Sequence, residues 1–70
     1  MKAKNNIQKI RWERKVTQRE LATRSGVSPS TVADIENGLQ EPRQSTMIML
    51  AKALELPVTE VFDLEWRDEQ

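Results

Sequence analysis

Apolar residues recur at intervals of three or four positions through most of the chain, which is the spacing of one face of an α-helix. Together with capping and turn residues, this pattern predicts five short helices. They are a first helix capped by Asn5 or Asn6 and running to about Lys15, a second from Gln18 to Gly26, a third from Pro29 to Gly38, a fourth capped by Ser45 or Thr46 and running to about Leu54, and a fifth from Val58 to about Asp63. The residues after Asp63 alternate between polar and apolar, which is typical of an extended arm. We therefore expect a compact all-α domain over residues 1–63, followed by a C-terminal arm or tail over residues 64–70.

Capping and turn residues define the second and third predicted helices. Thr17 and Glu20 have the Ser/Thr-x-x-Glu spacing of a capping box, in which the hydroxyl and the carboxylate each bond a free backbone N–H. Gly26 suits the left-handed conformation at a helix end. Ser28 can cap the next helix while Pro29 takes its first position. Two short helices joined by a turn of about three residues form a helix-turn-helix.

The apolar stripes also predict the core. In the first helix, Ile7 and Ile10 share a stripe with Arg11 and Arg14, while Trp12 falls on the opposite face. The contacts between the second and third helices are expected from Leu21, Ala22, Val27, Val32 and Ile35. The last two helices add Met47, Leu50, Ala51, Leu54, Val61 and Phe62.

The composition argues against an enzyme. The 70 residues include neither cysteine nor histidine, which removes disulfides, zinc-finger ligands and imidazole acid–base chemistry. No apolar run approaches the roughly 18 residues of a membrane span, and no leader pattern opens the chain. We expect a small cytoplasmic domain with no cofactor, no metal, no small-molecule ligand and no membrane partner.

The formal net charge is zero, but the charges are unevenly distributed. Residues 1–43 carry nine Lys and Arg against five Asp and Glu, whereas residues 44–70 carry two against six. The helix-turn-helix therefore lies in the basic part, an asymmetry that favours a nucleic-acid partner. An ordinary mixture of solvated charges is the alternative, because Asp34 and Glu41 lie within that basic part.

Short motifs follow one another through most of the chain. They are Ile7, Ile10-Arg11, residues 16–22, 26–28 and 31–38, Pro42, and residues 50–56. This ordered set resembles the Cro and phage-repressor class of helix-turn-helix proteins, the XRE family of bacteria and their phages, over roughly residues 7–62. The resemblance implies a five-helix, lambda-repressor-like DNA-binding domain. It further implies a transcriptional regulator, in the first place a repressor, that binds a palindromic operator in double-stranded DNA as a homodimer.

The resemblance also implies contacts with the DNA backbone. Gln18 matches a position whose side chain and backbone N–H hold a phosphate, as suits a helix N-terminus. Asn37 and Arg43 match backbone-contacting positions after the recognition helix, and Arg43 can also reach toward a minor groove. The charge of Arg19 makes it a further phosphate anchor. Structural roles are the alternative for Gln18, as a helix-start residue, and for Asn37, as part of the turn that ends the helix.

The same comparison assigns sequence readout to the third helix, at Pro29, Ser30, Thr31, Ala33 and Asp34. These stand where relatives often carry long amides or basic residues. Pro29 has no donor, whereas Thr31 and Ala33 can touch thymine methyl groups and Asp34 can accept from a cytosine amino group. We expect sparse base readout.

Two other features concern structure rather than DNA contact. Arg11 and Glu36 match a pair that, in the family, joins the first helix to the end of the third through a partly buried salt bridge. Lys15 replaces the glycine common at the end of the first helix, which places a positive charge where the backbone turns.

Apolar residues beyond those of the predicted core accumulate after residue 47. They are Ile48, Met49, Val58, Leu64 and Trp66. Such a concentration indicates a dimer interface built by the C-terminal third. The alternative is that Leu64 and Trp66 fold back over Trp12 and enlarge a small core.

A second class of function fits the same sequence. A domain of this kind can serve as a protein-interaction module, such as an antitoxin or an inhibitor of another regulator. Asp34 on the third, recognition helix and the acidic C-terminal part favour this alternative.

Overall fold

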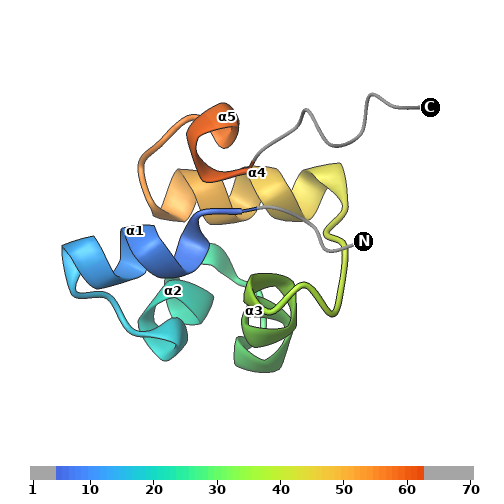
Figure 1. Cartoon of the computed structure of the whole chain (residues 1–70), viewed down its shortest axis with the longest axis horizontal. Helices are drawn as coiled ribbons and strands as arrows, with labels where there is room; N and C mark the ends of the chain where they lie inside the picture. Colours follow the sequence, from blue (N-terminus) through green and yellow to red (C-terminus); the bar gives the residue numbers. More distant parts are fainter. Residues whose placement is uncertain (1–4, 63–70) are drawn as a thin grey trace.

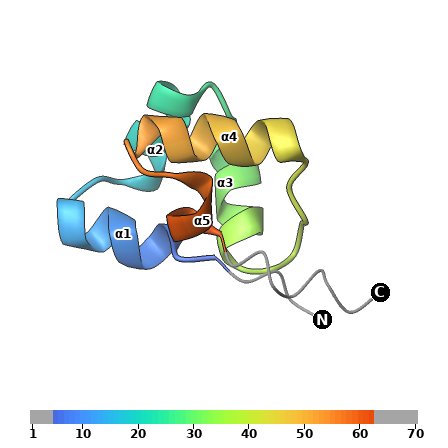
Figure 2. The same cartoon turned by 90° about the horizontal axis from the view of Figure 1, so that it is seen from above.

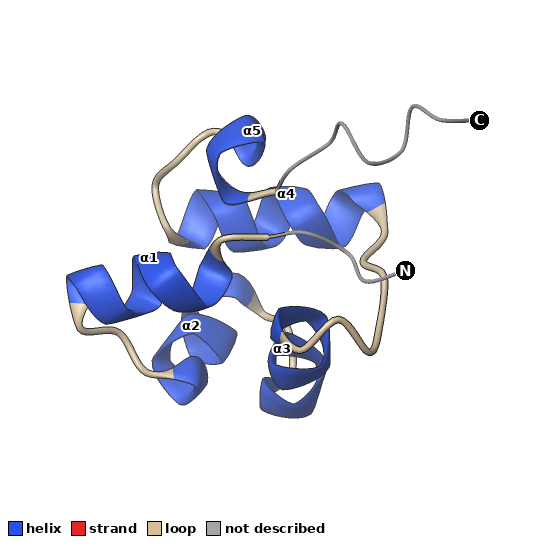
Figure 3. Cartoon of the chain, in the orientation of Figure 1, coloured by secondary structure: helices blue, strands red, loops and turns tan. Residues whose placement is uncertain are grey.

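The computed structural model describes residues 5–62. Within that range the chain forms five helices (Figures 1 and 3), namely α1 (Ile7–Arg14), α2 (Gln18–Ser25), α3 (Pro29–Glu36), α4 (Gln44–Ala53) and α5 (Val58–Val61). Helix α2 packs against both α3 and α4, and α5 packs against α4. Figure 2 shows the same helices from above, with α5 next to α4. The predicted all-α architecture is confirmed.

One apolar cluster with side chains from all five helices forms the core. Ile7, Leu21, Ile35, Leu50 and Val61 have no exposed surface. Every apolar side chain that the stripes assign to the core is buried, and Trp12 is 66% exposed as expected. Of the two arginines on the stripe of the first helix, Arg11 is buried and Arg14 is exposed. Val16, in the loop between α1 and α2, adds a core side chain that the helical stripes do not identify.

The capping residues of α2 and α3 act as predicted. The Thr17 hydroxyl accepts from the Glu20 N–H at 3.0 Å, and the Glu20 carboxylate accepts from the Thr17 N–H at 2.9 Å. Gly26 ends α2 in the left-handed region, with φ of 80°. Ser28 caps α3 by accepting from the Thr31 N–H at 3.2 Å. The helix-turn-helix is therefore specified largely by its local sequence.

Three helices end in a Schellman motif, in which one left-handed residue turns the chain back so that two N–H groups reach helical carbonyls. At the end of α3 the left-handed residue is Gly38, and the Leu39 N–H donates to the Asp34 carbonyl at 2.8 Å. At the ends of α1 and α4 the same position holds Lys15, with φ of 58°, and Glu55, with φ of 61°. The turn predicted at Lys15 is therefore present without a glycine.

The predicted cap of the fourth helix is wrong. Helix α4 begins at Gln44 with Arg43 as the N-cap residue, and no side chain caps it. Ser45 and Thr46 lie inside the first turn. The Arg43 carbonyl accepts from the N–H of Met47, whose side chain is buried. Burial of the inward stripe fixes where this helix begins and outweighs a cap worth about 1 kcal/mol.

The fifth helix is shorter than predicted. It ends at Val61, because the backbone of Phe62 is extended and forms an antiparallel bridge with Asn5. This conformation places the Phe62 side chain in the core, with 2% of it exposed. The predicted end at Asp63 and the predicted arm over 64–70 lie outside the described residues.

Two asparagines before α1 join three helices. The Asn5 side chain accepts from the Ile7 N–H at 3.2 Å and donates to the Ile35 carbonyl, near the end of α3, at 3.0 Å. Asn6 occupies the N-cap position of α1 but makes no side-chain cap. Instead its backbone and side-chain N–H groups donate to the carbonyls of Val61 and Glu60, at 2.7 and 3.1 Å.

None of the helices within residues 5–62 is long and apolar enough to cross a membrane.

Candidate nucleic-acid interface

Helix α3 packs one side against the core, and the side chains on its other side are exposed or partly exposed. Val32 and Ile35 are fully buried, and they hold the helix on the core. The outward positions are Pro29 and Ser30, which are exposed, and Thr31, Ala33 and Asp34, which are partly exposed. These five side chains are the ones to which the family resemblance assigns base readout. An α-helix with such a free side has the dimensions that the major groove of DNA admits.

The outward side chains of α3 offer few hydrogen-bond donors. The Ser28 hydroxyl donates to the Thr31 hydroxyl oxygen at 2.8 Å, so the Thr31 hydrogen stays available for an acceptor outside the helix. Asp34 only accepts when ionised, which suits a cytosine amino group and opposes a phosphate. Pro29 and Ala33 provide apolar contact alone. This surface can therefore make only a few contacts with base edges, and its Asp34 carboxylate opposes a phosphate placed beside it.

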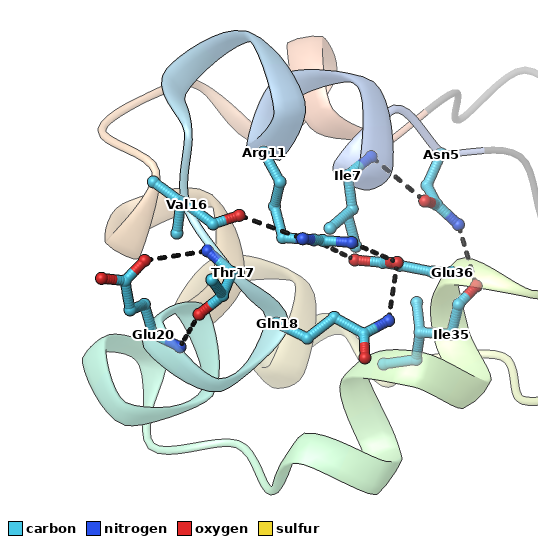
Figure 4. Close-up of polar contacts among 9 residues, drawn as sticks. All are labelled: Asn5, Ile7, Arg11, Val16, Thr17, Gln18, Glu20, Ile35 and Glu36. Atoms are coloured by element: carbon cyan, nitrogen blue, oxygen red, sulfur yellow. Dashed lines mark hydrogen bonds and ion pairs between the residues drawn. The ribbon is translucent and has the colours of Figure 1, made fainter.

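A buried polar network joins α1, α2 and α3 (Figure 4). Arg11 Nε donates to Glu36 Oε2 at 2.7 Å, and Arg11 Nη2 donates to Glu36 Oε1 at 3.1 Å. Arg11 Nη1 donates to the Val16 carbonyl at 3.0 Å. The two charged side chains are 8% and 1% exposed. The pair that the resemblance implies is thus a bidentate ion pair shielded from water, and its geometry is that of a strong charge-assisted contact.

Gln18 connects this network to the start of α2. Its side-chain Nε2 donates to Glu36 Oε1 at 3.0 Å, and the residue is partly exposed. As the first residue of α2, Gln18 also presents its backbone N–H at the helix N-terminus, beside that of Arg19. Free N–H groups at such an end favour an anion such as a phosphate. The side chain therefore holds the fold together while lying beside the proposed phosphate site.

Three further candidates are exposed on α2, at the end of α3 and at the start of α4. The Arg19 side chain is exposed on the first turn of α2. Asn37 is exposed at the end of α3, immediately before Gly38 in its turn, and Arg43 is exposed at the start of α4. The position of Asn37 in a Schellman motif accounts for its presence there without DNA.

The residues proposed for the dimer interface differ in how exposed they are. Ile48 and Met49 are 47% and 40% exposed on α4, whereas Val58 is half-buried and packs against the core. Leu64 and Trp66 lie outside the described residues. Leu39, which is 75% exposed in the loop after α3, is an apolar surface residue that the sequence patterns did not single out.

Sequence reasoning also missed Asn5 as a connection to α3. The Ser/Thr/Asn/Asp preference before a helix identified Asn5 as a possible cap. Its second bond, to the Ile35 carbonyl, joins residues 30 positions apart. No local pattern contains that information.

Comparisons with known proteins identify relatives over most of the described range. Residues 7–61 match the family described as helix-turn-helix, HTH_3. The chain is 44% identical over 52 residues to the HTH-type transcriptional repressor RghR of Bacillus subtilis (strain 168), covering 73% of this chain and 38% of that protein. It is 42% identical over 55 residues to the Immunity repressor protein of Bacillus phage phi105, covering 79% and 38%.

The similarity extends beyond bacteria and to solved structures. The chain is 42% identical over 48 residues to Multiprotein-bridging factor 1 of Candida albicans, covering 69% of this chain and 32% of that protein. An HTH_3 family transcriptional regulator from Vibrio cholerae matches with a TM-score of 0.75 and 25% identity, over 79% of this chain and 31% of that chain. The matched segment thus spans well under half the length of each of these proteins.

Proposed function

This chain belongs to the helix-turn-helix family HTH_3, and we propose that it regulates transcription by binding operator DNA as a homodimer. In this proposal α3 lies in the major groove and α2 crosses the sugar-phosphate backbone. Ser30, Thr31, Ala33 and Asp34 face the base edges, with Pro29 at the entrance to the groove. Gln18, Arg19, Asn37 and Arg43 face phosphates.

The observation that carries the proposal is the outward side of α3. The five side chains on this side are exposed or partly exposed, whereas Val32 and Ile35 on the opposite side are fully buried. The start of α2, with its free N–H groups and Arg19, belongs to the same helix-turn-helix. A reading helix next to an anion-binding helix end is the arrangement that positions a protein on duplex DNA.

Repression is the direction that the relatives favour. Two of them are named as repressors, one of Bacillus subtilis and one of Bacillus phage phi105. A domain of this size that occupies a promoter can exclude RNA polymerase simply by its volume. We therefore place repression ahead of activation.

Binding to another protein is the second candidate function. Asp34 puts a carboxylate on the reading helix, where it opposes phosphate. One relative is named a multiprotein-bridging factor. In this reading the same surface of α3 binds a basic protein partner, as an antitoxin or an inhibitor of another regulator would.

Selection of bound sequences from a random DNA pool separates the two functions. We expect a palindrome whose half-sites lie about 34 Å apart, one helical turn, because two copies related by a two-fold axis read successive major grooves. Recovery of no preferred sequence and no duplex binding at low salt would contradict DNA binding and favour the protein-interaction role.

A matched pair of variants ties the binding to α3. Ser30 and Ser45 are both exposed and both occupy the second position of a helix, in α3 and α4. A Glu at either position has the same favourable interaction with the helix dipole. Ser30→Glu places a carboxylate against DNA and is expected to lower affinity at least about 100-fold. Ser45→Glu is the control; because Ser45 lies two residues after Arg43, it is expected to lower affinity by no more than about threefold.

A further inference from the structure

The Glu36 carboxylate accepts from side chains of two other helices (Figure 4). Oxygen Oε1 accepts from Gln18 Nε2 at 3.0 Å and from Arg11 Nη2 at 3.1 Å, and Oε2 accepts from Arg11 Nε at 2.7 Å. Because an ionised carboxylate can only accept, the Gln18 amide has to direct its NH₂ group, and not its carbonyl oxygen, toward Glu36. The hydrogen bond to Glu36 therefore determines which way the Gln18 amide faces.

The same contact leaves one amide hydrogen of Gln18 available. An amide nitrogen carries two hydrogens, and Glu36 takes one of them. Within residues 5–62 the side chain makes no other hydrogen bond, and it is partly exposed. Figure 4 shows its carbonyl oxygen pointing away from Glu36. The second N–H thus belongs to a partly exposed side chain on the first residue of α2, and it is free for an acceptor outside residues 5–62.

We propose that Glu36 is a positioning residue for DNA, which orients the Gln18 amide so that its second N–H donates to a phosphate. The inference rests on the proposed DNA-binding function. The torsion at the end of a glutamine side chain is broad and two-fold, so a free amide presents its oxygen as readily as its nitrogen. An oxygen directed at a phosphate is repelled, and the freedom of an unheld side chain is lost on binding.

This role also connects two parts of the interface. Glu36 is the last residue of α3, and Gln18 is the first residue of α2. Their hydrogen bond fixes the end of the reading helix relative to the phosphate site. Backbone contacts set the register of a protein on the duplex, so this bond makes the phosphate contact and the placement of α3 interdependent.

A mutant cycle tests the inference. The background Arg11→Met/Glu36→Leu removes the ion pair while keeping net charge and approximate volume, a change that buried pairs often tolerate. Gln18→Ala is compared in the unchanged chain and in this background, with binding to a short random-sequence DNA duplex at low salt as the readout. Arg19→Ala is the control, since the structure shows no bond from its side chain to Glu36.

We expect Gln18→Ala to lower affinity about tenfold in the unchanged chain, as for one hydrogen bond to a charged group, and about twofold or less in the background. Arg19→Ala is expected to lower affinity by the same factor in both. Equal losses for Gln18→Ala in both, or no loss in the unchanged chain, overturn the role of Glu36 while leaving DNA binding intact. Failure of the unchanged chain to bind any duplex overturns the proposed function, and this inference with it.

A second measurement needs no variant, and it decides the question if the background does not fold. The two side-chain amide protons of Gln18 are followed by NMR while the duplex is added to the unchanged chain. We expect two distinct resonances, of which the one bonded to Glu36 stays in place and the other moves. Movement of both by the same amount, or of neither, contradicts the proposed orientation.

Discussion

At the residue scale, two helix ends hold a side chain in a conformation that favours glycine. Lys15 and Glu55 are exposed and have φ near 60°, in the left-handed region. The left-handed conformation costs an L-residue roughly 1–2 kcal/mol. At the end of α3 the equivalent position is Gly38. The sequence thus satisfies one of three similar turns with the residue best suited to it.

Replacing these two residues by glycine is expected to stabilise the fold. The relief of strain exceeds the extra chain entropy of glycine, about 0.5–1 kcal/mol. Lys15→Gly also loses a positive charge that the end of α1 favours, whereas Glu55→Gly removes a negative charge that the end of α4 disfavours. We expect urea melts to show a gain of about 1 kcal/mol for Glu55→Gly and less than about 0.5 kcal/mol for Lys15→Gly. A larger gain for Lys15→Gly would contradict the charge argument.

The Arg11–Glu36 pair makes a different contribution, because each charge depends on the other. With side chains 8% and 1% exposed, removal of one partner leaves a charge shielded from water and unpaired. Arg11→Met and Glu36→Gln are each expected to cost roughly 3 kcal/mol of unfolding free energy. The double variant is expected to cost less than the sum, because neither charge is then stranded. Additive losses below about 1 kcal/mol in denaturant melts would rule out this coupling.

At the element scale, the features that the sequence predicts are those set by near neighbours. The capping box at Thr17 and Glu20, the cap at Ser28 and the turn at Gly26 each depend on residues a few positions apart. The Arg11–Glu36 pair was expected only through the resemblance, since no spacing rule brings residues 25 positions apart together.

The start of α4 and the end of α5 were mispredicted because tertiary contacts decide them. Ser45 and Thr46 are good capping residues, but burial of Met47 and Leu50 starts the helix before them. Phe62 leaves the helix to bridge Asn5, which lies at the other end of the chain. In the candidate site, the sequence indicated which side of α3 faces outward. It gave no sign that Gln18 would bond Glu36, because that requires the packed arrangement of three helices.

The segment before α1 is expected to stabilise the helix arrangement through Asn5 in particular. Asn5→Ala removes the cap of Ile7 and one of the two donors to the Ile35 carbonyl, which keeps the Gly38 N–H at 3.1 Å. The expected cost is about 1–2 kcal/mol. Asn6→Ala is the matched control, since Asn6 is exposed and its side chain makes one bond, to Glu60. We expect it to cost less than about 0.5 kcal/mol, and similar small losses for both variants would show that Asn5 does not connect α1 to α3.

At the scale of the whole molecule, zero net charge does not prevent DNA binding, because the two parts of the sequence differ in sign. Residues 1–43 include the helix-turn-helix and carry the positive excess. If a dimer neutralises about four to six phosphates, the slope of log affinity against log salt concentration is expected to be near −4 to −5. Titrations on the selected operator measure this slope. A slope close to zero would mean that phosphate contacts contribute little.

The exposed apolar residues of α4 are relevant to whether the chain forms a homodimer. Single exposed apolar side chains are normal in monomers, but Ile48 and Met49 are neighbours on α4 and are 47% and 40% exposed. A 70-residue chain buries a limited core, so a second copy offers stability as well as a second reading helix. We therefore expect a homodimer that covers Ile48 and Met49. In the alternative, Leu64 and Trp66 cover Trp12 within one chain.

Sedimentation of two lysine variants distinguishes these arrangements, because each variant replaces a different exposed apolar residue with a charged one. Ile48→Lys places the charge in the proposed interface on α4, and burying it unpaired in a dimer is costly. Trp12→Lys is the control on α1, where the side chain is 66% exposed. We expect the unchanged chain and Trp12→Lys to sediment as dimers at tens of micromolar and Ile48→Lys as a monomer. If instead all three sediment as monomers and only Trp12→Lys is less stable to urea, the fold-back explains the apolar surplus and the dimer assignment fails.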